Sequence, residues 1–210
     1  MSRLLQLTAL VALALTGCGG SLFQTKAAPP TLYLLSARAV PPAAGADPAQ
    51  IPVDLAVLKP RVRAGLDTDR IAALYPDRRL EYFGGARWSG SLDEVIQQLA
   101  VQQFHATANL RNVSADGSVF ASDYWLEIEV TNFQAEYSAA AAAPVVHVHF
   151  LARVGSSADR HILATFEANA EQAASDNRLS AIVAAYNRAA ENALAEIIAG
   201  TVQALKVRRT

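Results

Sequence analysis

The feature that most constrains the fold is a strictly alternating segment in the second half of the chain. In residues 124–130, Leu126, Ile128 and Val130 alternate with Trp, Glu and Glu. Alternation with a period of two predicts a β-strand with one apolar and one polar face. An apolar sheet face has to be covered by another layer, so this segment predicts a sheet packed against helices.

Segments on both sides extend this pattern. Short runs rich in β-branched, aromatic and aliphatic residues predict further strands, and Pro76-Asp77 predicts the turn of a hairpin. These strands cover residues 31–36, 53–57, 70–75, 79–83, 145–154 and 161–168, and the strand at 124–130 extends toward residue 137. Helical spacing predicts two helices, one beginning at Ser91 and ending near residues 105–108 and one over 176–205. The spacing Ser91-x-x-Glu94 predicts a capping box for the first.

This order of elements predicts the fold class. We expect an α/β (α+β) chain that forms a single compact domain, with a mixed central sheet of about five to seven strands and two main helices packed on it. The glycines Gly84-Gly85 indicate a loop, and Gly200 is expected to loosen or bend the end of the second helix.

The only cysteine, Cys18, follows an apolar run over residues 4–15 that is too short to cross a bilayer, which needs roughly 20 residues. The run has the length of the apolar core of an export signal. Leu15-Thr16-Gly17-Cys18 matches the bacterial lipobox, in which the signal is cleaved between Gly17 and Cys18. We therefore expect a signal peptide at 1–17, a lipidated tether at 18–30 and a folded domain at 31–210. The alternative is an ordinary export signal with a chance cysteine.

Lipidation determines the expected chemistry and location. Cys18 would carry a covalent diacylglycerol and an N-acyl chain, such as palmitate, and no other cofactor is expected. Two or more acyl chains give stable anchoring, whereas a single chain binds only marginally. Gly19 stands where an Asp retains enterobacterial lipoproteins in the inner membrane. We therefore expect a lipid-anchored protein of the cell envelope, most simply at the outer membrane, with its domain in the periplasm.

Charge and motifs exclude several function classes. The formal net charge is −1, which gives no basic excess for binding nucleic acid. The chain has no G-x-S-x-G elbow, phosphate-binding loop or H-E-x-x-H motif. A metal site at His147 and His149, with His161 as a third ligand, lacks supporting spacing. The pair Asp67 and Asp69 and the serines Ser156 and Ser157 lack acid–base partners. We therefore predict no catalytic residue, no metal site and no enzyme activity.

A segment that joins the predicted hairpin to the first helix allows two interpretations. Arg87 and Trp88 lie just before the helix, and Arg70 lies on the neighbouring strand. In the first interpretation they form a packed corner, with Trp88 covering the start of the helix and Arg70 paired with Asp67 or with a carboxylate across the sheet. In the second, Arg70, Arg87 and Trp88 form a surface on which a partner docks.

A series of motifs supports a family assignment. After the lipobox come Tyr-x-Leu at 33–35, Leu-x-x-x-Arg-Ile at 66–71, and Leu-x-Tyr-Phe with Ala-Arg-Trp at 80–88. Phe133 and the loop that ends at Pro144 follow. The series resembles the ABC-type transport auxiliary lipoproteins, the PqiC-like family, over nearly the whole mature chain.

The resemblance implies a non-catalytic accessory lipoprotein of an MCE/ABC-type transport system for lipids or other hydrophobic molecules, contributing to envelope integrity. Its implied partners are an MCE-domain protein and, indirectly, an ABC permease and ATPase, together with the membrane that holds the anchor. A homo-oligomer, arranged as a ring around an MCE assembly, is also compatible with it. The alternative is an envelope lipoprotein that activates or scaffolds a cell-wall synthase or another outer-membrane assembly complex, because similar small domains serve such roles.

Overall fold

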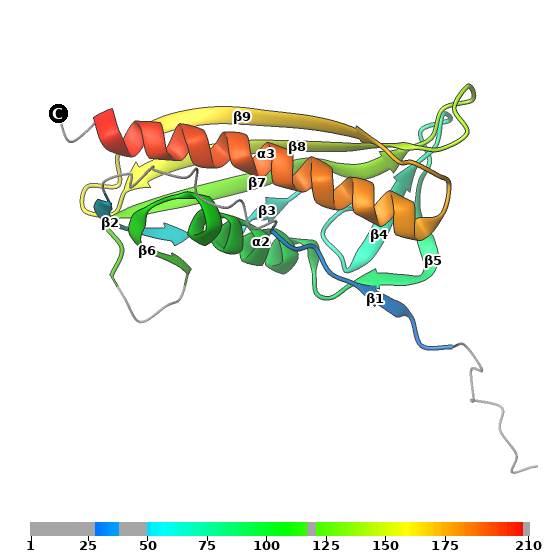
Figure 1. Cartoon of the computed structure of the whole chain (residues 1–210), viewed down its shortest axis with the longest axis horizontal. Helices are drawn as coiled ribbons and strands as arrows, with labels where there is room; N and C mark the ends of the chain where they lie inside the picture. Colours follow the sequence, from blue (N-terminus) through cyan, green and yellow to red (C-terminus); the bar gives the residue numbers. More distant parts are fainter. Residues whose placement is uncertain (1–27, 38–49, 117–120, 208–210) are drawn as a thin grey trace, which may run out of the picture.

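A computed structural model describes residues 28–37, 50–116 and 121–207. In this part of the chain nine strands form one mixed sheet, and two helices pack against it (Figure 1). The elements are β1 Thr31–Tyr33, β2 Ile51–Val57, β3 Arg61–Val62, β4 Arg70–Leu74, β5 Leu80–Trp88, α2 Leu92–Thr107, β6 Leu110–Ala115, β7 Tyr124–Glu136, β8 Val145–Ser156, β9 Ile162–Ala173 and α3 Leu179–Val207. The predicted α+β class with two packed helices is confirmed, but the sheet has more strands than predicted.

The 13-residue strand β7 organises the sheet. One of its edges pairs with β8 in antiparallel register along the whole strand, and β9 continues from β8 as a hairpin. Its other edge pairs in turn with three parallel strands: β2 at residues 124–126, β3 at 129–130 and β4 at 135–136. The sheet therefore forks into two arms, β2–β6 near the start of β7 and β4–β5–β1 near its end.

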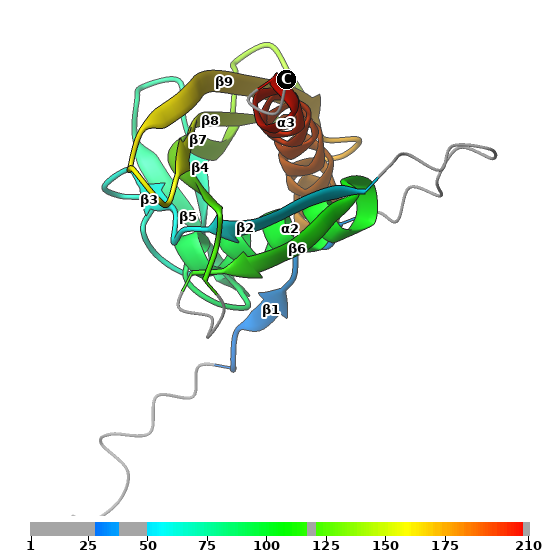
Figure 2. The same ribbon diagram turned by 90° about the vertical axis from the view of Figure 1, so that its left-hand side faces the viewer.

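The sheet curves around the helices, which lie on its concave face (Figure 2). On this face Leu126, Ile128 and Val130 are fully buried, as their alternation predicts. A bulge between Val130 and Asn132 shifts the register by one residue, so that Phe133 and Ala135 continue the buried row. The convex face keeps the polar residues of the same strands.

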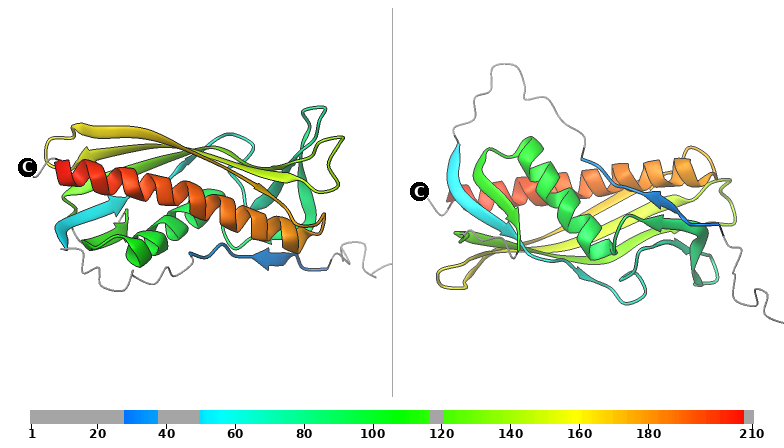
Figure 3. Two further views of the ribbon diagram at one scale, coloured as in Figure 1. Left: turned by 45° about the horizontal axis from the view of Figure 1, so that its top comes forward. Right: turned by 90° about the horizontal axis from the view of Figure 1, so that it is seen from below.

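Helix α3 runs along the molecule over β8 and β9 (Figure 3). Its buried face alternates large side chains with alanines such as Ala189, Ala190 and Ala193, which let the helix approach the sheet closely. The helix continues through Gly200 to Val207, two residues beyond the predicted end. A Cβ at Gly200 would lie 3.3 Å from the ring of Phe166, so the glycine makes room for that ring.

Several local predictions are also corrected. Ser91 is the N-cap of α2, but it makes no capping hydrogen bond to the backbone; its hydroxyl instead bonds the Asp93 carboxylate, which accepts from the Glu94 amide. Gly84 and Gly85 lie within β5 and not in a loop. There β5 bulges outward, because the pairing moves from Ala72–Tyr82 to Arg70–Arg87 and skips more residues on β5 than on β4. The short β3 and the polar β6 were not predicted.

Candidate functional site

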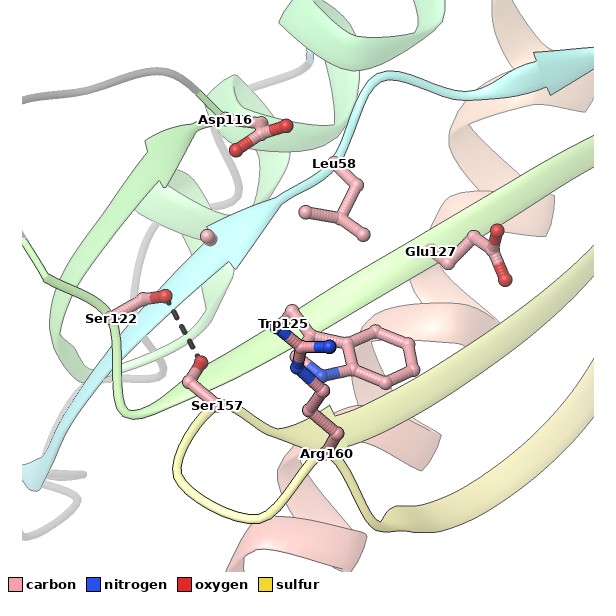
Figure 4. Close-up of a pocket in the computed structure, with 8 residues that line it drawn as sticks. Leu58, Asp116, Ser122, Trp125, Glu127, Ser157 and Arg160 are labelled. Carbon is pink, nitrogen blue, oxygen red and sulfur yellow. Dashed lines mark hydrogen bonds between the residues drawn. The ribbon is translucent and has the colours of Figure 1, made fainter.

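An open cleft lies where the β2–β6 arm meets the start of β7 and the turn between β8 and β9 (Figure 4). Its volume is about 390 Å³. The lining combines an aromatic ring and aliphatic groups with two hydroxyls and charged side chains: Ala56, Leu58, Asp116, Ser122, Trp125, Glu127, Ser157 and Arg160. We call this region the cleft end of the molecule.

Strand register explains why Trp125 forms the wall of the cleft. On the convex face it is paired with Ala56 on one side and with Gly155 on the other, so a large ring stands between two small residues. A Cβ at Gly155 would lie 2.0 Å from a carbon of the indole, so the ring occupies the space that a side chain there would need. The indole Nε1 donates to the Ser156 carbonyl at 3.3 Å, which fixes the ring against the turn.

Some polar side chains of the cleft have hydrogen-bond or ion-pair partners within the described part of the protein, and one charged side chain does not. The Ser122 and Ser157 hydroxyls lie 3.3 Å apart and bond each other. The Glu127 carboxylate is held by two arginines, Arg61 and Arg153, each at 2.9 Å. Arg160 is exposed and forms no ion pair with the residues that the structure describes. Its guanidinium is therefore the charge at the cleft that is free to meet an acidic group.

Arg160 also has an unusual backbone conformation. Its φ is 58°, in the left-handed region that residues other than glycine rarely adopt. This conformation closes the turn between β8 and β9, where Ser156 and the following strand exchange a backbone hydrogen bond from the Ser156 amide to the His161 carbonyl. The turn thus presents the Arg160 side chain at the cleft beside Ser157 (Figure 4).

A charge cluster fixes the backbone next to this cleft. Arg111 of β6 bonds both carboxylate oxygens of Asp54 at 2.8 and 2.6 Å, and it reaches Asp123 at 2.9 Å. These hydrogen bonds lower the pKa of Asp54 and raise that of Arg111. Asp123 also accepts from the Asp54 amide. The cluster ties β2 and β6 to the segment that leads into β7.

The two serines singled out in the sequence, Ser156 and Ser157, lie at the turn between β8 and β9. Ser156 is buried and its amide donates to the His161 carbonyl, while the Ser157 hydroxyl bonds that of Ser122. The nearby His161 contributes backbone groups to the turn. Within the described ranges, no histidine side chain is hydrogen-bonded to either serine hydroxyl.

His147 and His149 lie half-buried on the convex face of β8, as predicted. His147 lies 3.2 Å from Glu171, and His149 lies 3.5 Å from Glu167 and 2.6 Å from the Thr131 hydroxyl. Across residues 28–37, 50–116 and 121–207, no group of three or more His, Cys, Asp or Glu side chains is arranged to hold a metal ion.

Of the three residues in the predicted corner, Trp88 lies in the core and Arg70 and Arg87 lie on the surface. Trp88 is the last residue of β5 and is only 2% exposed, with edge contacts to Phe133 and Tyr186. Such a ring is unavailable to a partner, so the packed interpretation holds for Trp88. Its ring contacts join the end of β5 to β7 and to α3.

The two arginines of this corner remain on the surface. Arg87 bonds both oxygens of Asp69 at 2.7 and 2.8 Å, and these bonds lower the pKa of Asp69. Arg70 stacks on Tyr82, with its guanidinium 3.8 Å from the ring centre, instead of pairing with Asp67. Docking of a partner at Arg70 and Arg87 stays a prediction.

The predicted cleavage site, Gly17 and Cys18, lies outside the described residues. Neither helix of the described chain is long and apolar enough to cross a membrane.

The cleft at Trp125 was not predicted from the sequence, although the alternation around it correctly places the ring on the polar face. The pairing of Trp125 with a glycine about thirty residues away depends on register, which the sequence alone does not give.

Comparisons with known proteins agree with this geometry. The family model described as ABC-type transport auxiliary lipoprotein component matches residues 33–199. The fold is similar to the crystal structure of protein XCC0632 from Xanthomonas campestris, family DUF330, with a TM-score of 0.75 and 23% identity over 86% of this chain and 99% of that one. It is also similar to hypothetical protein CT253 from Chlamydia trachomatis, with a TM-score of 0.51 and 11% identity over 74% of this chain and 99% of that one. No curated protein matches the chain.

Proposed function

Because the chain belongs to the family of ABC-type transport auxiliary lipoprotein components, we propose that it is a non-catalytic accessory subunit of an ABC-type transport system that moves lipids or other hydrophobic molecules. The observation that carries this proposal is the family match, which extends from β1 to α3 and so covers nearly all of the described domain. The subunit carries out no reaction and instead connects two parts of the system. The anchor holds the domain at a membrane, and the domain contacts the protein that bridges toward the permease.

The anchor in this proposal is Cys18, at the outer membrane, with the domain in the periplasm. Lipidation is tested by growing cells with a palmitate analogue and isolating the wild-type chain and a Cys18→Ser variant. Label is expected in the wild type only. Equal label in both chains would show that Cys18 is not the attachment site.

The contact with the transport system is assigned to the cleft end. Its indole, aliphatic groups and free guanidinium suit a partner segment that carries an apolar side chain next to a carboxylate. We propose an MCE-domain protein as that partner, with the ABC permease and ATPase bound through it.

The test is affinity purification of the full-length lipidated chain from detergent-solubilised envelopes, followed by mass spectrometry. An MCE-domain protein is expected with the wild type and should be depleted with Trp125→Ala. A matched control is Tyr124→Ala, which alters a neighbouring half-buried ring that does not line this cleft. Recovery of a cell-wall synthase in place of any transport protein would overturn the proposal in favour of the scaffold alternative.

A further inference from the structure

Two exposed leucines lie on the short strand β1 and directly after it. Leu32 is 58% exposed and Leu34 is 70% exposed, whereas Leu35, the next residue, is buried. The alternation means that the chain turns every second side chain toward the core and leaves the leucines in water. Neighbouring aliphatic side chains that remain exposed beside a filled core indicate a surface that contacts something else.

Two arginines lie in the same row as these leucines. Leu32 is paired with Arg87 in the β1–β5 register, and Arg87 is paired with Arg70 in the β5–β4 register, so the three side chains lie on one face of three adjacent strands. Asp69 compensates the charge of Arg87. Arg70 has only the Tyr82 ring as its partner among the described residues, so its positive charge is uncompensated. We call Leu32, Leu34, Arg70 and Arg87 the anchor corner.

The first described residues, which follow Cys18 in the sequence, lie beside the anchor corner. Ala28 and Pro30 line a cleft together with Arg70 and Arg87, so the first described residues lie against the corner. Nine residues lie between Cys18 and Ala28, and the ten residue-to-residue steps from one to the other span at most about 35 Å. Residues 18–46 include Lys26 and Arg38 but no Asp or Glu, so the whole segment suits an anionic surface.

We propose that the anchor corner rests on the phospholipid surface, with the two leucines in the interfacial layer and Arg70 and Arg87 at the phosphate groups. This inference rests on the proposed lipidation of Cys18, because a short anchor keeps lipid headgroups at a high effective concentration beside the corner. Two leucines and one free cation would bind a membrane weakly by themselves. Next to an anchor they are sufficient to fix the orientation of the domain.

The orientation has a consequence for the rest of the molecule. The anchor corner and the cleft end lie toward opposite ends of the long axis (Figures 1 and 3). A domain that rests on its anchor corner therefore holds Trp125 and Arg160 away from the lipid, where a partner that bridges the periplasm can reach them.

The experiment uses the lipidated chain in vesicles and a fluorophore at residue 34. Because Cys18 is the only native cysteine, lipidation leaves no free thiol, and Leu34→Cys introduces a single site for an environment-sensitive dye. The matched control is Ile162→Cys, an exposed aliphatic residue at the cleft end that is 47% exposed. The vesicles contain phosphatidylcholine alone or an equal mixture with phosphatidylglycerol, with a nitroxide quencher on the acyl chains.

The expected result is quenching of about two-fold or more at residue 34 and none at residue 162, because the dye at residue 34 lies in the interface. Substituting Arg70 with Ala should reduce the quenching more in the anionic mixture than in phosphatidylcholine alone, and added salt should have the same effect on the Arg70 chain. Equal quenching at both positions would overturn the orientation. If the dye at residue 34 is unquenched in vesicles but becomes shielded when an envelope protein is added, the anchor corner binds that protein and not lipid.

The two proposals fail in different ways. If Cys18 carries no lipid, its thiol takes up dye in the wild-type chain and the protein does not stay with the vesicles, which refutes the anchor. If the anchor holds and residue 34 is unquenched, the anchor corner does not rest on lipid although the lipoprotein assignment stands.

Discussion

The two tryptophans of the chain differ in their surroundings: Trp88, on β5, packs near the end of β7, whereas Trp125 lies at the start of β7. Trp88 is 2% exposed and packs against Phe133 near the end of the strand. Trp125 lies at the start of the strand on the convex face, where it forms one wall of an open cleft. The same residue type thus supports the core beneath the anchor corner and lines an open cleft at the cleft end.

The difference arises from what each ring faces across the sheet. Trp88 is at the concave side, where Tyr186 of α3 covers it with ring centres 5.2 Å apart. Trp125 lies on the convex face, where it stands between the small residues Ala56 and Gly155 and its ring packs directly on Gly155. Within one sheet, the tryptophan on the helix-covered face is therefore fixed by packing, while the one on the convex face borders an open cleft.

The largest effect is expected where Trp88 is removed. Trp88→Ala should lower the free energy of unfolding by about 3–5 kcal/mol, because the cavity left between Phe133 and Tyr186 cannot close. Trp125→Ala removes a half-buried ring at the surface and should cost about 1 kcal/mol or less. Urea unfolding of both variants gives the comparison. Equal costs would mean that Trp125 is part of the core and that the cleft is not an independent surface.

Gly155 tests how firmly the cleft end depends on its ring. Gly155→Ala places a Cβ within 2.0 Å of the indole and should cost about 1–3 kcal/mol through overpacking. In a Trp125→Ala background the same substitution should cost much less, since the obstructing ring is absent. Unfolding of the four chains of this double-mutant cycle measures the coupling. Purely additive costs would contradict the packing of Trp125 on Gly155.

The ion pair between Asp69 and Arg87 at the anchor corner tests a weaker, electrostatic contribution to stability. Asp69→Asn breaks the exposed pair with Arg87 and should cost less than about 1 kcal/mol at neutral pH, because solvent screens both side chains. Arg87 lowers the pKa of Asp69, so the carboxylate stabilises the fold above its ordinary pKa of 3.8. That contribution is lost as pH falls through the lowered pKa.

The measurement for this pair is the unfolding free energy of both chains between pH 6 and pH 2. The wild type and Asp69→Asn should differ at the upper limit and converge at the lower one. A difference that stays constant with pH would show that the hydrogen bonds at Asp69, and not its charge, stabilise the corner.

The sequence was sufficient to predict the parts of the fold that rest on local periodicity. The strands β7, β8 and β9 and both helices follow from alternating or helical spacing, and the hairpin of β4 and β5 follows from its turn. Strand β6 was missed because Arg111, Asn112 and Ser114 interrupt its apolar pattern, and it is held by parallel pairing with a distant β2. Such pairings are non-local and leave no spacing signal.

The candidate sites also differ in how much of them the sequence predicts. Arg70 and Arg87 were selected from the sequence and do lie at the surface, but their partners Tyr82 and Asp69 depend on the bulge of β5. The cleft at Trp125 depends on register between strands far apart in the chain. Local pattern therefore predicts which face a residue occupies, whereas the residues that meet it across the sheet come only from the three-dimensional pairing.

The smallest effect on stability is expected at Arg160, and this makes it the sharpest probe of the cleft. Arg160→Gly relieves a left-handed conformation that costs about 1 kcal/mol, and glycine loses a similar free energy through the greater entropy of its unfolded chain. Unfolding should change by less than about 0.5 kcal/mol, while recovery of the partner in affinity purification should fall. Arg160→Lys keeps the charge and should retain more partner. Unchanged recovery with Arg160→Gly, at unchanged stability, would separate Arg160 from binding and leave Trp125 as the basis of recognition at this end.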